Sequence, residues 1–358
     1  MTGAITFMRW AALFGVALVL AGCGREEAPP VQDIEEAARP GPVLVVTGEG
    51  ERLRFASFNA LVSWLDGIED QPLAITLAPG EYRLRAPLRL PSRSSLTGSG
   101  QGVTVLIARE NMDSVVANRD PEGGNSAITL SGFSVDCTRR ARHGLLLIRT
   151  SALHIERVEA RRCRDTGVRV SGHGEITRGT VLEAVSAHNN DGHGIVIMWA
   201  TRNARYSNLY ASGNGQTGIV IDHSEGSAVN LQADGNRQDG IFIRNVFAVT
   251  ATNLVATRNG RHGIYVQGMV ASAGASWTAQ GNSRSEAGAH DELHFTADDT
   301  LSYGRTRNSV IHGVVLGAYI NGLGEPTARH GLYIAPEITA LEIAGLAFEP
   351  VLDTPQGP

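Results

Sequence analysis

Apolar and polar residues alternate in short runs that recur at a nearly constant interval through the middle of the chain. Each run is a glycine followed by an apolar residue, any residue and a second apolar residue. The six clearest copies begin 22 to 27 residues apart, at Gly144, Gly167, Gly194, Gly218, Gly240 and Gly263. An alternation of period two predicts a β-strand, and no helical periodicity lies between the copies. The pattern is typical of a β-solenoid in which each unit forms one coil.

Two series of asparagines keep step with these glycines. They are Asn208, Asn230 and Asn253, followed six residues later in each unit by Asn214, Asn236 and Asn259. Asparagine tolerates the left-handed backbone of a sharp turn, and its amide can bond its copies in the neighbouring coils. We therefore expect both series to mark corners. Within the strand at 195–197, we expect Ile195 and Ile197 to pack inside and Val196 to face out.

The asparagine corner, the spacer and the Gly-Ile-any-Ile strand together resemble the repeats of the right-handed parallel β-helix superfamily, the pectate-lyase-like folds. The resemblance covers about residues 72 to 350. It implies an all-β, right-handed parallel β-helix, and the spacing predicts about ten coils. The superfamily includes lyases, glycosidases, epimerases, phage tailspikes and adhesins, so the resemblance specifies fold far more than function.

The segment before the repeats predicts a short helix that ends near Gly67. Apolar residues spaced for one helical face occur at Phe58, Leu61, Val62, Leu65 and Ile68. Because the first coil of a solenoid leaves its core open, we expect this helix to act as a lid. The predicted layout is an N-terminal cap at 43–70, the parallel β-helix at 71–350 and a C-terminal tail at 351–358.

The first residues resemble a bacterial lipoprotein signal. Arg9 precedes eleven largely apolar residues, 10–20, and the run ends in Leu20-Ala21-Gly22-Cys23. Eleven residues are too few for a membrane span, which needs about 20. The resemblance implies a signal peptide at 1–22 and lipidation of Cys23. It also implies an envelope lipoprotein in the outer membrane facing the periplasm, because Gly24 is not the aspartate that retains such proteins at the inner membrane.

Residues 23–42 are rich in Glu, Ala and Pro, which predicts a disordered tether. Cys137 and Cys163 then remain as an even pair at equivalent points of neighbouring coils. They form either a disulfide between coils or two buried thiols. No cysteine cluster of the metal-binding kind occurs.

Charge narrows the choice of partner. The chain has 31 basic and 36 acidic residues, a net charge of −5, and every basic residue is arginine. This balance argues against nucleic acid and against an anionic membrane surface. The lack of lysine excludes a lysine base or a Schiff base, whereas the arginine fork suits the carboxylates of uronic acids. We expect an acidic polysaccharide or another glycan as the partner.

In a parallel stack, equivalent outward positions of successive coils lie about 5 Å apart, so surface columns can be read from the sequence. The first column reads Leu146, Arg169, Val196, Val220, Phe242, Tyr265, His294 and Tyr333. The second reads Ile148, Ser171, Met198, Asp222, Arg244, Gln267, Thr296 and Ala335. In pectate-lyase-like folds the glycine-led strand generally forms the substrate groove, and a sugar-binding floor needs aromatic and polar groups.

The best candidate site combines Arg244, Tyr265 and His294 as catalytic residues with Asp222 and Phe242 as substrate-binding residues. A uronate lyase or epimerase must neutralise a carboxylate, remove the C5 proton, and protonate the leaving oxygen or the opposite face. Arg244 suits the first task, His294 the second and Tyr265 the third. The structural alternatives are an Asp222–Arg244 ion pair, a Phe242–Tyr265 aromatic ladder and a solvated histidine.

A second row precedes the glycines and includes His143, His193, His262 and His330, with Asp239 in the same place of another coil. Asp239 and His262 would add a neighbouring acid and base along the groove edge, and His223 after Asp222 is a further candidate. The alternative is a row of polar turn residues. We expect no metal site, because ligands spaced by whole coils lie far apart.

Signatures of individual families are mostly missing. Gly172-His173-Gly174 resembles a turn of polygalacturonase-like glycosidases, but the aspartates that precede it there are absent, and the pair Asp298-Asp299 comes later. The alginate C5-epimerases carry an Asp-Pro-His triplet and a lysine, and this chain has neither. No acidic cluster resembles the pectate-lyase calcium site, so we expect no cofactor, and no motif supports calcium.

Two functions stay open. The first is a membrane-tethered protein that binds or processes an acidic, uronate-containing polysaccharide, as a lyase by β-elimination or as a C5 epimerase. The second is a non-catalytic β-helix lipoprotein of the cell envelope that binds a glycan or a protein. Its contacts would be Phe242, Tyr265, Tyr333 and Arg169.

Overall fold

The structure is a computed structural model that describes residues 43–174, 177–199, 201–317, 319–320, 328–348 and 351–352. The expected signal peptide at 1–22, the lipidated Cys23 and the tether at 23–42 lie outside these residues. None of the helices in the described ranges is long and apolar enough to cross a membrane.

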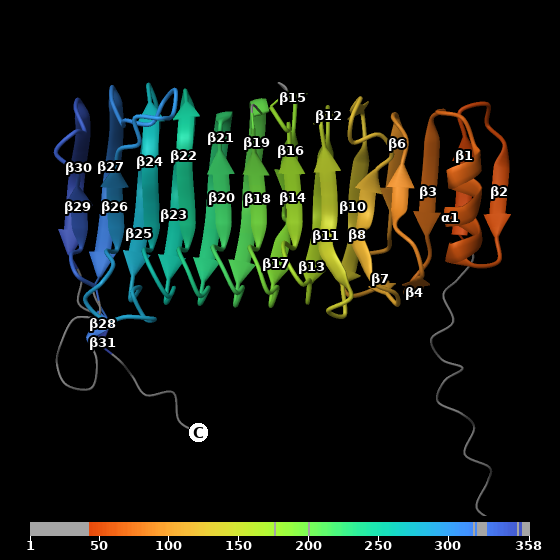
Figure 1. Cartoon of the computed structure of the whole chain (residues 1–358), viewed down its shortest axis with the longest axis horizontal. Coiled ribbons are helices and arrows are strands. Elements are labelled where there is room, and N and C mark those ends of the chain that lie inside the picture. The colour runs from red at the N-terminus through yellow and green to blue at the C-terminus, as the bar shows by residue number, and fades with distance from the viewer. Residues whose placement is uncertain are drawn as a thin grey trace, which may run out of the picture. The chain divides into compact units, whose positions relative to one another are not determined.

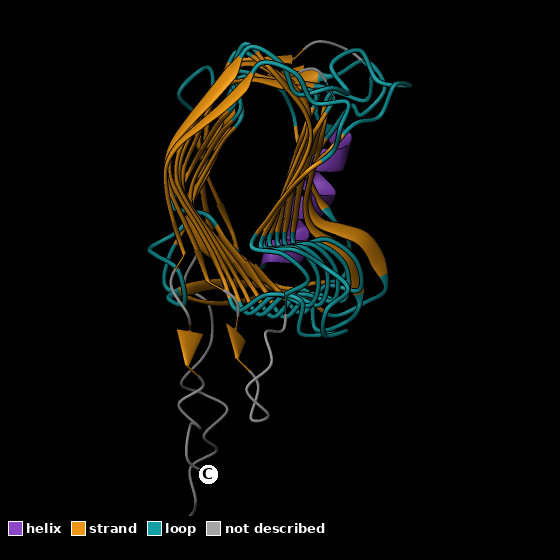
Figure 2. Ribbon diagram, turned by 90° about the vertical axis from the view of Figure 1, so that its left-hand side faces the viewer, coloured by secondary structure: helices purple, strands orange, loops and turns teal. Residues whose placement is uncertain are grey.

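The described strands wind into a parallel β-solenoid of about eight turns (Figure 1). Figure 2, viewed along the stack, shows the strands of successive coils lying behind one another. All described pairs are parallel except those that β1 makes with β2 and β3. The all-β parallel architecture confirms the prediction from the repeats, whereas the expected count of about ten coils is not confirmed.

The larger described sheet has 17 strands. Their bounds are β1 Val43–Thr47, β2 Arg52–Phe55, β3 Leu73–Leu77, β4 Gly80–Leu84, β6 Ser94–Thr97, β7 Thr104–Ala108, β10 Thr129–Asp136, β13 His154–Arg161, β15 Thr177–Arg178, β16 Val181–Glu183, β17 Ser186–His188, β19 Thr201–Ser212, β21 Ser224–Asp234, β23 Val249–Thr257, β25 Ala273–Gln280, β27 Ser309–Gly317 and β30 Leu341–Phe348.

The second sheet has ten strands and contains every glycine-led triplet. Its strands are β5 Leu88–Leu90, β8 Met112–Asn118, β11 Ala141–Ile148, β14 Val168–Ser171, β18 Ile195–Met198, β20 Ile219–Asp222, β22 Ile241–Phe247, β24 Ile264–Val270, β26 Leu293–Thr296 and β29 Leu332–Ile334. Two small pairs complete the set: β9 Asn125–Ser126 with β12 Thr150–Ser151, and β28 Tyr319–Ile320 with β31 Val351–Leu352.

The triplets form the inner wall of the core in the predicted register. Ile195 pairs with Ile219, which pairs with Ile241, and the column continues to Ile264. Ile195 and Ile197 have no exposed surface, as the alternation predicts. Val196, which we expected to face out, is itself only 5% exposed, so the outer side of the strand is also covered at this coil.

Both asparagine series stack, but in different environments. Asn230 donates from Nδ2 to Oδ1 of Asn208 at 2.9 Å, and Asn253 donates to Asn230 in the same way. Asn208 and Asn253 are exposed and Asn230 is half-buried, and all three have positive φ, as expected for corners. The second series is buried, and there Asn236 Nδ2 lies 3.0 Å from Asn259 Oδ1.

The buried ladder explains why glycine leads each triplet. A Cβ atom on Gly240 would lie 2.5 Å from Nδ2 of Asn259, the asparagine of the next coil. The amide therefore occupies the space that any larger residue would need. The sequence predicted both features but not this contact between them.

Helix α1, Phe58–Gly67, occurs where the apolar spacing predicts it. The side chain of Ser57 caps its first turn by accepting a hydrogen bond from the amide of Ala60, and its inner face is buried. Its action as a lid on the first coil stays a prediction.

Of the two alternatives for the cysteines, the structure has the disulfide, with the Cα atoms of Cys137 and Cys163 4.7 Å apart.

Candidate active site

The first outward column brings four rings together on the ten-stranded sheet. Phe242 pairs with Tyr265, Tyr265 with His294, and His294 with Tyr333. The rings of Phe242 and Tyr265 are stacked, with centroids 4.8 Å apart. Tyr265 meets His294 edge-on at 5.2 Å, and His294 stacks on Tyr333 at 4.7 Å. The predicted column is therefore a continuous ring ladder with an imidazole inside it.

A buried aspartate, Asp291, holds the imidazole of His294 in place. Oδ2 of Asp291 lies 2.6 Å from Nδ1 of His294, and Asp291 has no exposed surface. Arg329 donates to both carboxylate oxygens, at 3.1 and 2.8 Å, and Nδ1 of His330 lies 2.8 Å from Oδ1. Burial raises the pKa of Asp291, but the hydrogen bonds from His294, Arg329 and His330 outweigh it and hold the pKa below its usual range. Asp291 is therefore an anion.

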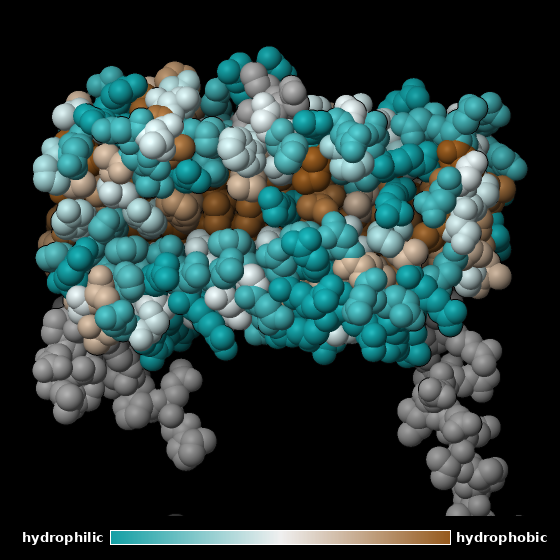
Figure 3. All heavy atoms as spheres, viewed as in Figure 1, coloured by the Kyte–Doolittle hydropathy of each residue, from teal (hydrophilic) through white to brown (hydrophobic). Residues whose placement is uncertain are grey.

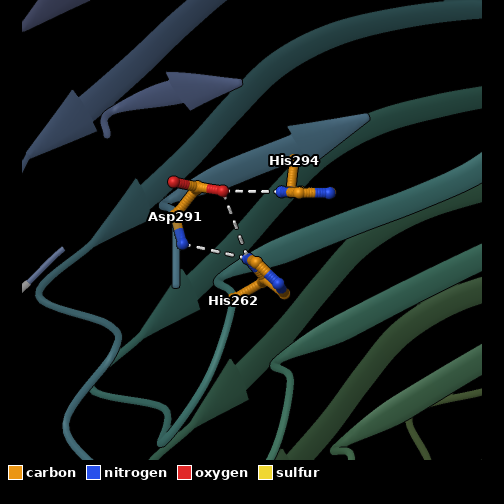
Figure 4. A group of neighbouring side chains, drawn as sticks. All are labelled: His262, Asp291 and His294. Carbon is orange, nitrogen blue, oxygen red and sulfur yellow. Dashed lines mark hydrogen bonds and ion pairs between the residues drawn. The ribbon is translucent and has the colours of Figure 1, made fainter. Parts of the chain in front are cut away.

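This contact fixes which nitrogen of His294 can accept a proton. An ionised carboxylate only accepts hydrogen bonds, so Nδ1 carries a hydrogen and Nε2 keeps its lone pair when the ring is neutral. Figure 4 shows Nδ1 turned toward Asp291 and the other ring nitrogen turned away from it. The side chain of His294 is 13% exposed. This is the geometry of an oriented general base.

His262 lies beside this base in a different protonation state. The amide of Asp291 donates to Nδ1 of His262 at 2.9 Å, and the ring centroids of His262 and His294 are 4.3 Å apart. Burial, together with the charges of His294 and His290, lowers the pKa of His262 to about 3. His262 is therefore neutral at physiological pH, with its proton on Nε2, where it can donate to a ligand.

Asp239 is the member of the same row in the coil before His262. It is 7% exposed, and its Oδ1 accepts the backbone N–H of His262 at 3.1 Å. Burial raises the pKa of Asp239 to about 6, although the hydrogen bond from His262 and the charge of Arg261 lower it. The predicted neighbours Asp239 and His262 are thus in contact, through the backbone of the histidine.

Asp291 belongs to this same row before the glycines, and sequence reasoning missed it. Leu293 pairs with Ile264, so Asp291 is the counterpart of His262 and Glu292 is the counterpart of Gly263. Sequence reasoning located the members of this row by the glycine that follows each of them, and Asp291 is followed by Glu292 instead. Counting two residues back from Leu293 would have found Asp291. Arg329 and His290 were missed because long turns carry no periodic signal.

The predicted contact between Asp222 and Arg244 is present. Nη1 of Arg244 lies 3.5 Å from Oδ2 of Asp222, and Nδ1 of His223 lies 2.6 Å from Oδ1. Asp222 is 1% exposed, and its burial raises its pKa despite the charges of His223 and Arg244. The ion-pair interpretation of these two residues therefore holds in the structure, while Arg244 keeps an exposed side-chain fraction of 33%.

Tyr265 retains its phenolic proton in this environment. Burial, followed by the charges of Asp239 and Asp298, raises the pKa of Tyr265, and Arg244 opposes this rise. A protonated hydroxyl can donate a hydrogen bond or a proton.

Arg169 lies on β14, five strands from β26, so the structure does not bring it to the ring ladder, and its role in binding stays a prediction.

His262, Asp291 and His294 form the described group whose ligand atoms, all within 4.8 Å, could hold a metal ion. The ligand atoms of His262 and Asp291 already accept hydrogen bonds within the protein. Nδ1 of His262 accepts the amide of Asp291, and both oxygens of Asp291 accept from Arg329. A cation would have to displace a guanidinium and a backbone hydrogen bond, so the group fits proton transfer better than metal coordination.

The outer face of the sheet is recessed between polar margins. Figure 3 shows a strip of apolar side chains between two polar borders, in the region where Figure 1 labels β18 and β20. The outward residues of these strands, Val196 and Val220, are 5% and 8% exposed. An apolar floor with polar edges is the expected form of a groove that binds an extended ligand.

Comparison with known proteins supports the fold. A family described as "right handed beta helix region" matches residues 123–283. Together with the parallel topology, this match supports a right-handed parallel β-helix fold. A search of curated protein sequences gave no match.

Several solved structures are similar to this chain. The enzymatically active domain of tailspike protein 2 of bacteriophage CBA120 is 15% identical, over 75% of this chain and 42% of its own, with a TM-score of 0.57. The A-module of the Azotobacter vinelandii mannuronan C-5 epimerase AlgE4 is 19% identical, over 83% and 93%, with a TM-score of 0.49. The periplasmic alginate epimerase AlgG is 14% identical, over 82% and 89%, with a TM-score of 0.45. The likeness to the tailspike domain, at 15% identity, shows the fold alone.

Proposed function

We propose that this right-handed parallel β-helix binds an acidic, uronate-containing polysaccharide along its ten-stranded sheet and removes the C5 proton of a uronate with His294. The observation that carries the proposal is the 2.6 Å contact between His294 and the buried, ionised Asp291. A buried carboxylate that orients an imidazole within a ring-lined face is the arrangement of a general base.

The reaction needs a base, an acid and a charge partner for the carboxylate. Nε2 of His294 takes the C5 proton, and the electron pair moves into the C5–C6 bond as the carboxylate becomes an enediolate. The N–H groups of Arg244 and His262 are the donors available to stabilise that charge. In β-elimination the pair then returns to form the C4–C5 double bond, the C4–O bond breaks, and Tyr265 protonates the leaving oxygen. In epimerisation Tyr265 instead protonates C5 from the opposite face.

The polymer would bind by ring stacking. The ladder of Phe242, Tyr265, His294 and Tyr333 offers successive ring faces and edges at the spacing of the coils. The apolar faces of sugar rings stack on aromatic side chains, while polar groups orient the hydroxyls. A polysaccharide chain laid across the strands would therefore contact several coils at once.

The proposal places the protein in an oxidising part of the cell envelope. The disulfide between Cys137 and Cys163 fits such a compartment, because disulfides are rare in reducing cytosol.

We further propose the outer-membrane anchor at Cys23 that the first residues imply. Membrane fractionation of cells expressing the parent and the Cys23→Ala variant tests it. The parent should sediment with outer membranes and the variant should not, and equal fractionation would remove the anchor from the proposal.

The second candidate function is non-catalytic binding of a glycan, or of a protein, on the same face. The observation that favours it is the ring ladder, whose rings pack against one another over four coils. In that case Phe242, Tyr333 and Arg169 supply affinity, and His294 is a ladder member without a chemical role.

One assay separates the two functions. Uronate polymers are incubated with the parent, with His294→Gln and with a matched control, His312→Gln, whose histidine is exposed on β27 of the other sheet. Products are followed by ultraviolet absorbance of unsaturated ends and by proton NMR, which also detects a C5 epimer of unchanged mass. The proposal requires product with the parent and the control, and none with His294→Gln. Polymer binding without product in the parent would establish the non-catalytic function instead.

A further inference from the structure

A small pocket lies at the far end of strands β20 and β22, away from the row that contains His262 and Asp291. It has a volume of about 170 Å³, and its lining includes Arg202, His223, Asn245, Phe247 and Tyr303. Pockets for drug-sized ligands span roughly 300–1,000 Å³, so this one has room for a single ring. Asn245 is on β22, two strands from β26, which puts the pocket about 10 Å along the stack from the coil of His294.

Aromatic side chains form its walls. The rings of Phe247 and Tyr303 are stacked with centroids 5.2 Å apart. Trp199 stacks on His223 at 4.9 Å beside the pocket, and Trp199 remains 41% exposed. A tryptophan of this exposure, held flat against an imidazole, offers a free ring face at the pocket margin, which suits the C–H face of a sugar.

One buried polar group in the pocket lacks a partner. Asn245 is 1% exposed, and its Oδ1 accepts the amide of Tyr303 at 2.5 Å, which fixes the orientation of the side chain. Its Nδ2 has no hydrogen-bond partner among the described residues. A buried amide donor left unpaired is unfavourable. A ligand hydroxyl or ring oxygen in the pocket would satisfy it.

The remaining polar groups are held in fixed positions. Nε of Arg202 lies 3.2 Å from Glu225, and Nδ1 of His223 lies 2.6 Å from the buried Asp222. Neither side chain needs to reorganise to meet a ligand, and the guanidinium of Arg202 has further N–H groups that suit a carboxylate. Aromatic walls, one amide donor and a guanidinium together match the chemistry of an acidic sugar.

We propose that this pocket is a second binding site, which holds one pyranose ring of the acidic glycan while another residue of the same polymer, the reacting uronate, lies at His294. The inference rests on the proposed function for the identity of the glycan. The pocket fixes the position of the polymer along the stack, so it sets affinity and the choice of residue that reaches His294. It takes no part in the chemical step.

Isothermal titration of the full chain with uronate hexasaccharides tests the proposal, with a neutral hexasaccharide for comparison. Asn245→Asp keeps the acceptor for the amide of Tyr303 and removes the free donor, and Phe247→Ala removes one wall. Each should raise Kd about tenfold or more. The control Tyr210→Ala, at a 40% exposed ring on β19 of the other sheet, should bind as the parent does. Asn245→Asp carries the test if Phe247→Ala fails to fold.

The outcomes separate this inference from the proposed function. Unchanged Kd in Asn245→Asp and Phe247→Ala, with turnover lost in His294→Gln, would overturn the pocket and leave the proposed function standing. Weakened binding in both pocket variants, with no product from the parent, would support the pocket and overturn the proposed catalysis. A parent that binds none of the hexasaccharides would overturn both.

Discussion

Oδ2 of the fully buried Asp291 lies 2.6 Å from Nδ1 of His294, although the two residues are separated by only two others at the entry to β26. The turn before β26 brings Asp291, from the row before the glycines, into contact with His294, from the first outward column. The aspartate settles the tautomer of His294 and leaves Nε2 to accept a proton. The proposed chemistry depends on this contact.

Asp291→Asn should reduce turnover by about 10²-fold or more, because an amide in place of the carboxylate no longer stabilises an imidazolium or favours one tautomer. Steady-state kinetics on a uronate polymer measures the loss, and circular dichroism verifies the fold. Arg329→Gln is the matched control, since it leaves the contact between Asp291 and His294 in place, and its turnover should fall less. Equal losses in the two variants would show that the site needs the whole charge cluster rather than this pair.

Tyr265→Phe should keep the stack on Phe242 and lose the hydroxyl, so binding should stay within about twofold while turnover falls roughly 10²–10⁴-fold. Titration and kinetics on the same preparation give both values. Tyr333→Phe removes a hydroxyl from another ring of the ladder and should leave turnover unchanged. If Tyr265→Phe turns over like the parent, Tyr265 serves only for stacking.

Glu292→Gln should make the protein more stable at neutral and alkaline pH. Burial raises the pKa of Glu292 to about 7, while hydrogen bonds from Asn282 oppose the rise. The folded protein therefore holds a proton that the unfolded chain releases above its ordinary pKa of about 4.3, and stability falls as pH rises through that window. Above pH 7 the variant should gain on the order of 3 kcal/mol relative to the parent, and the gain should vanish at about pH 4.

Urea unfolding at several pH values measures this difference. Glu337→Gln, at an exposed glutamate, controls for the loss of one negative charge. A difference between Glu292→Gln and the parent that does not change with pH would show that Glu292 is not protonated in the folded state.

The two asparagine ladders should differ in energetic weight. Asn236→Ala removes the acceptor of two buried donors, the amide N–H and Nδ2 of Asn214, and should cost about 2–5 kcal/mol. Asn230→Ala breaks exposed bonds and places alanine at a φ of 57°, which should cost about 1–2 kcal/mol. Denaturant unfolding of the two variants provides the comparison. Equal costs would mean that burial of the ladder adds nothing to its strength.

The repeat predicts most of the fold because its signals are periodic. The triplets place Tyr265 beside His294, and the asparagines place the corners, from composition and spacing alone. Asp291 could not be found in the same way, since Glu292 replaces the glycine that marks its row. The contact between Asn245 and Tyr303 depends on a turn that folds back onto β22, and contacts of that kind leave no period in the sequence.

Proton exchange at C5 shows whether His294 removes the C5 proton of a uronate. A uronate polymer is incubated in D₂O with the parent and with His294→Gln, and the C5–H and olefinic resonances are followed by NMR. We expect the parent to exchange deuterium into C5 or to produce olefinic signals, and His294→Gln to do neither while binding the polymer normally. Equal exchange or elimination in the two proteins would show that His294 is not the base.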